Sequence, residues 1–494
     1  MRLSPIALAA LVGATALSAQ AIPDRPEKIA VKPITFNVPK AKDARVKLKN
    51  GITAYLVPDA AGQPLVTVSL LIKGGTFLDP VGKEGASSLM GTLLRSGGTS
   101  RTPAEKLDEK LDFLAANLNA FLGETSGNLN LNLLAKDLKE GLDLMLEVLT
   151  EPAFQQDRLD LAKKNVRQGL ERRNDDTTTI ERYQQGLLLR GEKHYSNRFT
   201  TAASLDAITR DDLKALHARL LTPQNFAVSV SGNFDRKAVE KLLNDTLGAL
   251  KPGKDAKASP RVPAPEHAIQ PGIYVCEKDV NQGRVTLSLP GLRQIDPDWP
   301  AVEVMNHILG GGDFSSRLVK KIRSDEGLAY SVGSYFTPGP FYPGTFTALF
   351  QTKVPTVAYG IRLALAELER IKREPVSEEE LKVAKGSIVD SFPDTFGTKA
   401  VVARVFLGME NTGLPETYYE TYRERIAAVT LADVQRVAQK YLAADRVAIL
   451  VVGGKAADLE AGDAKDHPGK LSEVAKLPVV KLPLRDPLTM KPLK

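Results

Sequence analysis

Residues 310–330 read GGGDFSSRLVKKIRSDEGLAY. Three consecutive glycines suit a backbone that takes φ > 0 or approaches another group closely. The apolar residues that follow have helical spacing, the run Asp-Glu-Gly ends the helix, and a strand is predicted to begin at Leu328. The helix presents Arg323 near its C-terminal end, and the strand presents Tyr330 close by. A guanidinium and a phenol placed together can hold a peptide carbonyl or a developing oxyanion, although such pairs are also common as surface residues.

The composition is that of an ordinary globular protein. Of the 494 residues, 43% are hydrophobic and 25% are charged, and this length allows roughly three domains or fewer, larger ones. The net charge of +7 is small, and the basic residues are interspersed with acids, which argues against nucleic-acid binding. Cys276 is the single cysteine, so an intrachain disulfide and a thiolate metal cluster are excluded. Its apolar, strand-like surroundings predict a buried structural thiol.

The first 21 residues are typical of a secretory signal peptide. Arg2 gives a positive start, residues 5–17 are an apolar run too short to span a bilayer, and residues 19–21 form an A-x-A cleavage pattern. We therefore expect cleavage after Ala21 and a periplasmic or secreted protein. The sequence contains no other stretch apolar enough to cross a membrane, so no membrane anchor is expected.

The mature chain is expected to form two domains joined by a linker. Residues 22–41 are predicted to be an extended arm, and residues 42–250 a first domain. Residues 251–272, rich in Pro, Lys and Ala, are typical of an exposed linker. A second domain is predicted at 273–455. Residues 456–494 form a Lys- and Pro-rich tail without a helical or strand pattern, expected to be disordered or to lie as an extended arm on a neighbour.

The order of elements repeats after the linker. A helix that stops at Pro152 and is followed by another helix has a counterpart at Pro375, 223 residues later. The segment TRDDL at Thr209, which runs into a strand, has a counterpart TLADV at Thr430, 221 residues later. The nearly equal offsets predict two homologous halves. Strands followed by packed helices within each half indicate an α+β fold.

The duplicated halves, the linker and the glycine-rich block together resemble the inverzincin zinc metallopeptidases, the family of pitrilysin, insulinase and mitochondrial processing peptidase. The resemblance covers nearly all of residues 42–455. Its most specific pieces are LGGG at 309–312, SRL at 316–318, Arg323 and GLAY at 327–330. It implies an antiparallel-rich sheet covered by helices in each half, with the linker joining the halves into a clam-like chamber.

The family's zinc site is H-x-x-E-H on a helix, with a distant Glu as third ligand. The two His share one helix face, and the Glu is the general base for the zinc-bound water. Residues 85–102 resemble this helix, but its positions are degenerate: they are Ser88, Gly91 and Thr92, with Gly169 at the third-ligand position. Two of the four have no side chain, so the resemblance implies no metal in this chain.

The histidines do not supply an alternative site. The chain has His194, His217, His267, His307 and His467. No two of them are three to five residues apart, and each is expected to be a surface or capping residue. A zinc site built from scattered histidines, or a serine nucleophile at Ser87 or Ser88, would need partners that the sequence does not place nearby.

The resemblance implies a division of labour between two subunits. In the family, the residues that match Arg323 and Tyr330 reach toward the zinc and help to hold substrate and intermediate. Gly310, Gly311 and Gly312 are the predicted substrate-binding backbone. The first hypothesis is therefore a non-zinc, substrate-binding subunit of an exported heterodimeric metalloendopeptidase that degrades peptides, with the zinc on a homologous partner. The alternatives are an inactive scaffold, similar to the peptidase-like subunits of respiratory complexes, or a periplasmic peptide-binding protein that uses an edge strand.

Overall fold

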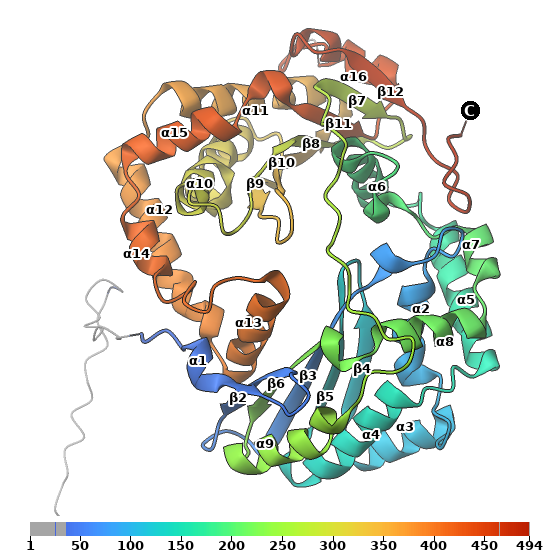
Figure 1. Ribbon diagram of the computed structural model, residues 1–494. Helices are drawn as coiled ribbons and strands as arrows, with labels where there is room; N and C mark the ends of the chain where they lie inside the picture. The colour runs from blue at the N-terminus through green and yellow to red at the C-terminus, as the bar shows by residue number, and fades with distance from the viewer. Residues whose placement is uncertain (1–24, 26–35, 464, 494) are drawn as a thin grey trace, which may run out of the picture. The chain divides into compact units, whose positions relative to one another are not determined.

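Two six-stranded sheets with equivalent strand orders form the framework of the protein (Figure 1). The computed structural model describes residue 25 and residues 36–463 and 465–493. In spatial order the first sheet contains β1 (Arg45–Lys47), β2 (Thr53–Pro58), β6 (Phe226–Gly232), β3 (Leu65–Lys73), β5 (Ser126–Leu134) and β4 (Asn117–Leu122). The second contains β12 (Val479–Leu482), β7 (Gly272–Cys276), β11 (Ala448–Val452), β8 (Gln282–Pro290), β10 (Thr345–Lys353) and β9 (Val332–Thr337). The predicted duplication is confirmed for five of the six strands in each sheet; the sixth, β1 or β12, comes from opposite ends of the chain and pairs antiparallel in the first sheet but parallel in the second.

Helices follow the strands in the same order in both halves. The first half has α1 (Ala41–Ala44), α2 (Ala86–Ser96), α3 (Ala104–Phe113), α4 (Leu138–Thr150), α5 (Gln156–Glu171), α6 (Thr177–Arg190), α7 (Ala202–Ala207), α8 (Arg210–Leu220) and α9 (Arg236–Asp245). The second half has α10 (Trp299–Asn306), α11 (Val357–Arg373), α12 (Glu378–Ser391), α13 (Lys399–Thr412), α14 (Tyr422–Ala427), α15 (Leu431–Tyr441) and α16 (Ala456–Ala461). The expected α+β class, with mostly antiparallel sheets covered by helices, is confirmed.

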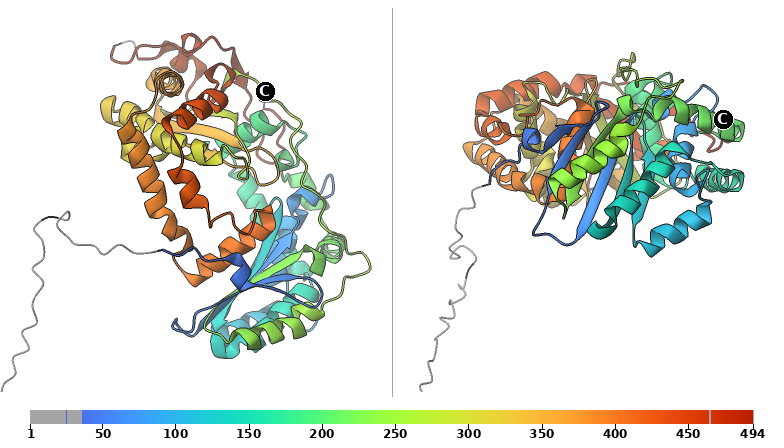
Figure 2. Two further views of the ribbon diagram at one scale, coloured as in Figure 1. Left: turned by 60° about the vertical axis from the view of Figure 1, so that its left-hand side comes forward. Right: turned by 60° about the horizontal axis from the view of Figure 1, so that its bottom comes forward.

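The two faces of the first sheet are covered by helices from different halves. Leu70 and Ile72 of β3 point into the main core of the first half, to which α4 and α9 contribute. Leu71 points to the opposite face, because side chains alternate along a strand. There it packs with Ala227 of β6 and with Leu407 of α13, a helix of the second half (Figure 2). A helix from beyond the linker therefore completes the first sheet.

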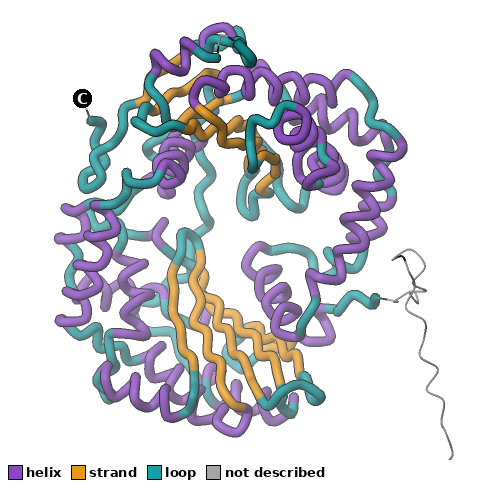
Figure 3. Tube along the Cα trace, turned by 180° about the vertical axis from the view of Figure 1, so that it is seen from behind, coloured by secondary structure: helices purple, strands orange, loops and turns teal. Residues whose placement is uncertain are grey.

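Conversely, a helix of the first half covers the second sheet. Helix α6 of the first half packs against β8 and β11. Its Ile180 and Tyr183 lie in one buried cluster with Cys276, which confirms the predicted buried thiol. Glu181 accepts a hydrogen bond from Arg284 Nε at 2.7 Å. By its internal contacts the chain from residue 38 onward is one compact unit, and the exchanged helices explain why (Figure 3).

The C-terminal tail differs from expectation because it contains regular structure. Helix α16 begins the tail, and β12 pairs in parallel with β7 at the edge of the second sheet. Prolines flank β12, and an edge strand tolerates proline because one side of the strand has no partner. Met490 is buried in the cluster around α6. The tail therefore lies on this chain's own second half.

The remaining segments contain little regular structure. Residues 251–271 contain no helix or strand, and β7 begins directly after them. The predicted signal peptide at 1–21 lies outside the described residues. Within the described part of the chain, the helices are too short or too polar to cross a membrane.

Candidate functional site

The predicted Arg–Tyr pair meets at the end of a π-helix, η9 (Val319–Asp325). The Cζ atom of Arg323 lies 4.7 Å from the centre of the Tyr330 ring and 4.5 Å from that of the Phe314 ring. Tyr330 is 86% exposed and Phe314 is 64% exposed. Cation–π attraction therefore positions a guanidinium between two solvent-facing rings. Insertions of π-helix within helices are frequent at functional sites.

Tyr330 lies in a loop, not in the strand predicted from Leu328. The helix ends at Asp325, within the predicted Asp-Glu-Gly run, and Gly327 adopts φ of +63°. The carbonyl of Leu328 then accepts a hydrogen bond from Thr352 Oγ1 at 2.8 Å, which holds the loop, and β9 begins at Val332. Tyr330 is therefore outside the strand ladder, and its ring is free to lie on the guanidinium.

The polar groups of the pair are available to a ligand. Within the described residues, neither the guanidinium of Arg323 nor the phenol of Tyr330 has a hydrogen bond or ion pair with a side chain or backbone group. The guanidinium offers five N–H donors, and the phenol offers one O–H. The rings of Phe314 and Tyr330 therefore hold the guanidinium at the surface while its N–H groups stay available to a ligand.

Arg317, from the motif SRL, has a different environment although it belongs to the same block. It is 8% exposed and donates two hydrogen bonds to Glu380 of α12, at 2.7 and 2.9 Å. The guanidinium holds the pKa of Glu380 far below its usual range, at about 2. Arg317 therefore ties the helix that precedes Arg323 to α12, and the sequence alone did not separate these two arginines by role.

The three glycines act through close approach and not through φ. None of Gly310, Gly311 and Gly312 has a positive φ; the positive φ falls on Asp313, at 46°. A Cβ at Gly310 would lie 2.6 Å from the backbone nitrogen of Ser334, so the segment η7 (His307–Gly311) can pack on β9 only with glycine there. The role of these glycines in binding substrate stays a prediction.

The degenerate zinc positions do not fit a metal ion. Ser88 and Thr92 are exposed one turn apart on α2, and Thr92 Oγ1 donates to the backbone oxygen of Ser88 at 3.1 Å. A Cβ at Gly91 would lie 2.6 Å from the backbone nitrogen of Leu122 on β4. Strand β4 therefore occupies the space that a side chain would need at the position matching the family's Glu. Gly169 is exposed on α5, where a Cβ would meet open space. Among the described residues there is also no group of three His, Cys, Asp or Glu side chains that could hold a metal.

Two of the histidines confirm the predicted capping role. His217 Nε2 donates to the backbone oxygen of Leu149 at 2.8 Å, at the C-terminal end of α4, and burial lowers the pKa of this imidazole. His194 precedes a short 3₁₀ helix and accepts a hydrogen bond from the backbone N–H of Ser196. In His217 the Nε2 atom makes this structural contact, and in His194 the Nδ1 atom does, while the Nε2 atom of His194 is buried without a hydrogen-bond partner among the described residues.

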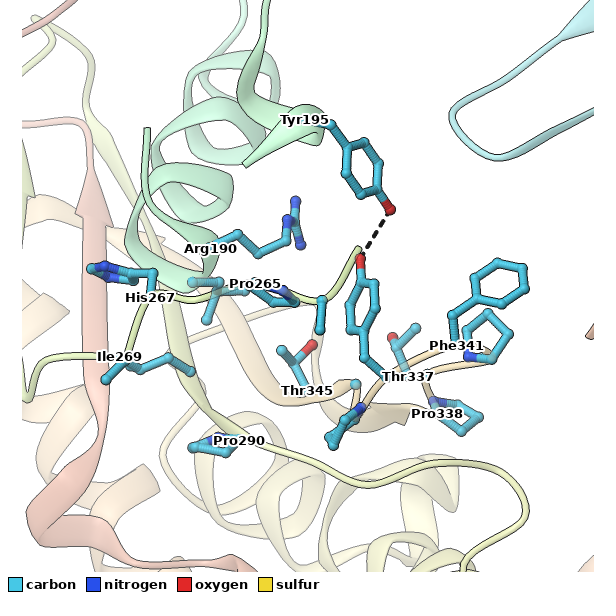
Figure 4. Close-up of a pocket in the computed structure, with 18 of the residues that line it drawn as sticks. Arg190, Tyr195, Pro265, His267, Ile269, Pro290, Thr337, Pro338, Phe341 and Thr345 are labelled. Carbon is cyan, nitrogen blue, oxygen red and sulfur yellow. Dashed lines mark hydrogen bonds between the residues drawn. The ribbon is translucent and has the colours of Figure 1, made fainter. Parts of the chain in front are cut away.

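A cavity that the sequence did not predict lies beside the linker. Its volume is about 730 Å³, and its walls come from α6, the linker and the loop between β9 and β10 (Figure 4). Tyr195 of the first half and Tyr342 of this loop share a hydrogen bond between their hydroxyls at 3.1 Å. The volume is that of a typical ligand site. The only signal in the sequence is the run PGPFYPG at 338–344, which is typical of a turn.

Comparisons with known proteins identify relatives for both halves. A family model described as "Insulinase (Peptidase family M16)" matches residues 55–186, and one described as "Peptidase M16 inactive domain" matches residues 207–388. An "Uncharacterized zinc protease" of Rickettsia bellii is 26% identical over 357 residues, which are 69% of this chain and 81% of the relative. The "Non-peptidase homolog YmxG" of Helicobacter pylori is 25% identical over 403 residues, 80% of this chain and 90% of that protein.

The fold is also found in solved structures. The crystal structure of a peptidase M16 inactive domain from Pseudomonas fluorescens superposes with a TM-score of 0.74 at 23% sequence identity, and the match covers 83% of this chain and 97% of that chain. At this level of identity the likeness concerns the fold alone.

Proposed function

Because this chain belongs to peptidase family M16 and is a member of the inactive type, we propose that it is the non-zinc, substrate-binding subunit of an exported heterodimeric metalloendopeptidase that degrades peptides. A homologous partner with an intact H-x-x-E-H motif carries the zinc. This chain contributes Arg323 and Tyr330 to the shared site. The complex is located in the periplasm or is secreted.

One contrast carries the proposal. In the first half, Gly91 has lost the side chain that the chemistry needs, and β4 occupies the space it would fill. In the second half, Arg323 and Tyr330 keep unpaired donors beside each other at the surface. Such donors suit a peptide carbonyl and the negative oxygen that forms from it, but they do not cleave a peptide bond alone. A complementary subunit would supply what is missing.

The first test is peptidase activity and zinc content, measured for this chain alone and together with a homologue that carries H-x-x-E-H. We expect no activity and no zinc for the chain alone, and activity for the complex. Activity and zinc in the purified chain alone would overturn the proposal. A stable but inactive complex would favour the scaffold.

The role of the Arg–Tyr pair is tested in the active complex. Tyr330→Phe keeps the ring on the guanidinium and removes the donor, so turnover should fall about ten- to a thousand-fold at unchanged zinc content. Tyr335→Phe is the matched control, since Tyr335 is also exposed (47%) but lies in β9, and it should leave turnover unchanged. Wild-type turnover in Tyr330→Phe would remove the catalytic role.

A second candidate function, peptide binding without a partner, is favoured by strand β4. This strand is the edge of the first sheet, so the backbone groups on one side are available for an added strand. Phe121 on β4 is 63% exposed beside that edge. Tight binding of unfolded peptides to the isolated chain, without turnover in any complex, would favour this candidate.

A further inference from the structure

We propose that a pocket in the second half binds a primary alkylammonium group through Glu303 and a surround of aromatic rings. The pocket has a volume of about 310 Å³ and lies between α10, α12 and α14, three helices that contact one another (Figure 1). Trp299 and Glu303 of α10 form one wall, and Phe392 and three tyrosines at 418, 419 and 422 form the others. The pocket shares no lining residue with the Arg–Tyr site.

Glu303 carries a carboxylate oxygen that lacks a partner. Its Oε1 accepts a hydrogen bond from the hydroxyl of Tyr422 at 2.5 Å. Its Oε2 is buried and, among the described residues, accepts no hydrogen bond. A buried carboxylate oxygen without a donor is costly, so its presence calls for a partner from outside the chain. Burial also raises the pKa of Glu303, a change that a bound cation would reverse.

Aromatic rings surround this carboxylate. The Tyr422 ring stacks on Phe392, with centroids 4.8 Å apart and planes at 22°. The rings of Tyr418 and Tyr419 are perpendicular, with centroids 5.0 Å apart. The faces of such rings are electronegative and attract a cation that has lost its water. Together with the carboxylate they make a site for positive charge.

Arg425 is the obvious internal cation, and its charge opposes the effect of burial on the pKa of Glu303, but it donates no hydrogen bond to the unpartnered oxygen. Its guanidinium lies 4.5 Å from the centre of the Tyr418 ring and donates to the backbone oxygen of the same residue at 2.7 Å. It forms no ion pair with Glu303 in the described structure, and it does not line the pocket. The arginine therefore occupies one site beside the rings, and the carboxylate oxygen remains for a ligand.

The unpartnered oxygen selects the kind of cation. It needs an N–H donor, and a primary ammonium supplies three. A quaternary ammonium would meet the rings but leave Glu303 Oε2 without a hydrogen bond. The volume accepts a short alkyl chain, so the ligand is either a free alkylamine or the side chain of a lysine in a peptide.

The test is calorimetric titration of the full mature chain with n-butylammonium chloride, with n-butanol as the neutral isostere. We expect butylammonium to bind, and butanol and tetramethylammonium to bind at least ten-fold more weakly. Equal binding of butanol and butylammonium, or no binding of butylammonium, would overturn the proposal without any mutation. Titration with N-acetyl-lysine methylamide then identifies the source of the ammonium group. If this compound binds at least as tightly as butylammonium, the ligand is a lysine side chain in a peptide. If only butylammonium binds, the ligand is a free amine.

Variants locate the site. Glu303→Gln should weaken butylammonium binding at least ten-fold. Glu367→Gln is the matched control, because Glu367 is also buried with an unpartnered Oε2 but lies on α11 outside the pocket, and it should bind as wild type does. Equal binding by Glu303→Gln and wild type would place the ligand elsewhere and refute the proposal.

Discussion

Glu380→Gln tests whether the glycine-rich block depends on the buried Arg317. The two side chains form two parallel hydrogen bonds, and Glu380 Oε2 also accepts the backbone N–H of Ser377 at 2.8 Å, in the capping box of α12. Glutamine keeps an oxygen for the cap but loses the charge and one of the two bonds to Arg317. The loss of stability in Glu380→Gln therefore measures mainly the interaction between Glu380 and Arg317.

The magnitude follows from the pKa of Glu380. Arg317, together with hydrogen bonds from Ser377, lowers it from 4.5 to about 2, and each unit corresponds to about 1.4 kcal/mol, so the folded state gains at most roughly 3.5 kcal/mol. Because the Glu380 side chain is 29% exposed, solvent reduces this value, and we expect Glu380→Gln to lower the free energy of unfolding by about 2 kcal/mol at pH 7.

Urea unfolding between pH 7 and pH 2 measures this effect. The folded-state pKa is depressed, so the stabilisation is present above pH 4.5 and is lost as the pH falls toward 2. The difference between wild type and Glu380→Gln should therefore shrink over this range. Glu379→Gln, an exposed neighbour on α12, should change stability by less than about 0.5 kcal/mol. A similarly small effect of Glu380→Gln at pH 7, or one that persists undiminished at pH 2, would refute the reasoning.

Three further predictions concern packing. Gly91→Ala should destabilise the protein by about 1–3 kcal/mol because the added Cβ would meet the backbone of Leu122. Gly169→Ala should stabilise it by up to about 1 kcal/mol, because this Cβ would lie in open space and alanine favours the helix α5. Urea unfolding of both variants measures these changes, and a stabilising effect of Gly91→Ala would contradict the prediction. Glu181→Ala should cost about 2 kcal/mol, also measured by urea unfolding, because the partly buried Arg284 on β8 loses its carboxylate and keeps only Gln351 as a side-chain partner among the described residues. Burial raises the pKa of the Cys276 thiol, so iodoacetamide at pH 8 should label it only in urea, and rapid labelling of the native chain would show that α6 does not stay in place.

The duplication was predictable because its signals are local. Thr209 and Thr430 begin equivalent helices, and each forms a capping box with an aspartate three residues later, Asp212 and Asp433. A capping box depends on four consecutive residues, so it can be recognised in a sequence. The hairpin of β1 and β2 was predictable for the same reason, from the turn at Asn50 and Gly51 and the alternation around it.

Features that depend on distant contacts were not predictable. The exchange of α6 and α13 between the halves changes no local pattern, because each helix presents an apolar face whichever sheet it covers. Strand β9 begins later than predicted because a hydrogen bond from Thr352, more than twenty residues away, holds the loop at Leu328. The different roles of Arg317 and Arg323 likewise depend on whether a carboxylate of α12 lies nearby.

The candidate site is incomplete in this chain in a specific physical sense. At Gly91, restoring a carboxylate would require β4 to move, so the loss in the first half is fixed by backbone packing and not only by the missing side chain. At Arg323, a charged group stays at the surface with no hydrogen-bond partner among the described residues, held only by Phe314 and Tyr330. Solvated donors of this kind contribute little to stability, so the fold does not require them. The proposed partner would give these donors a use, and for this reason the activity of the mixed complex is the decisive measurement.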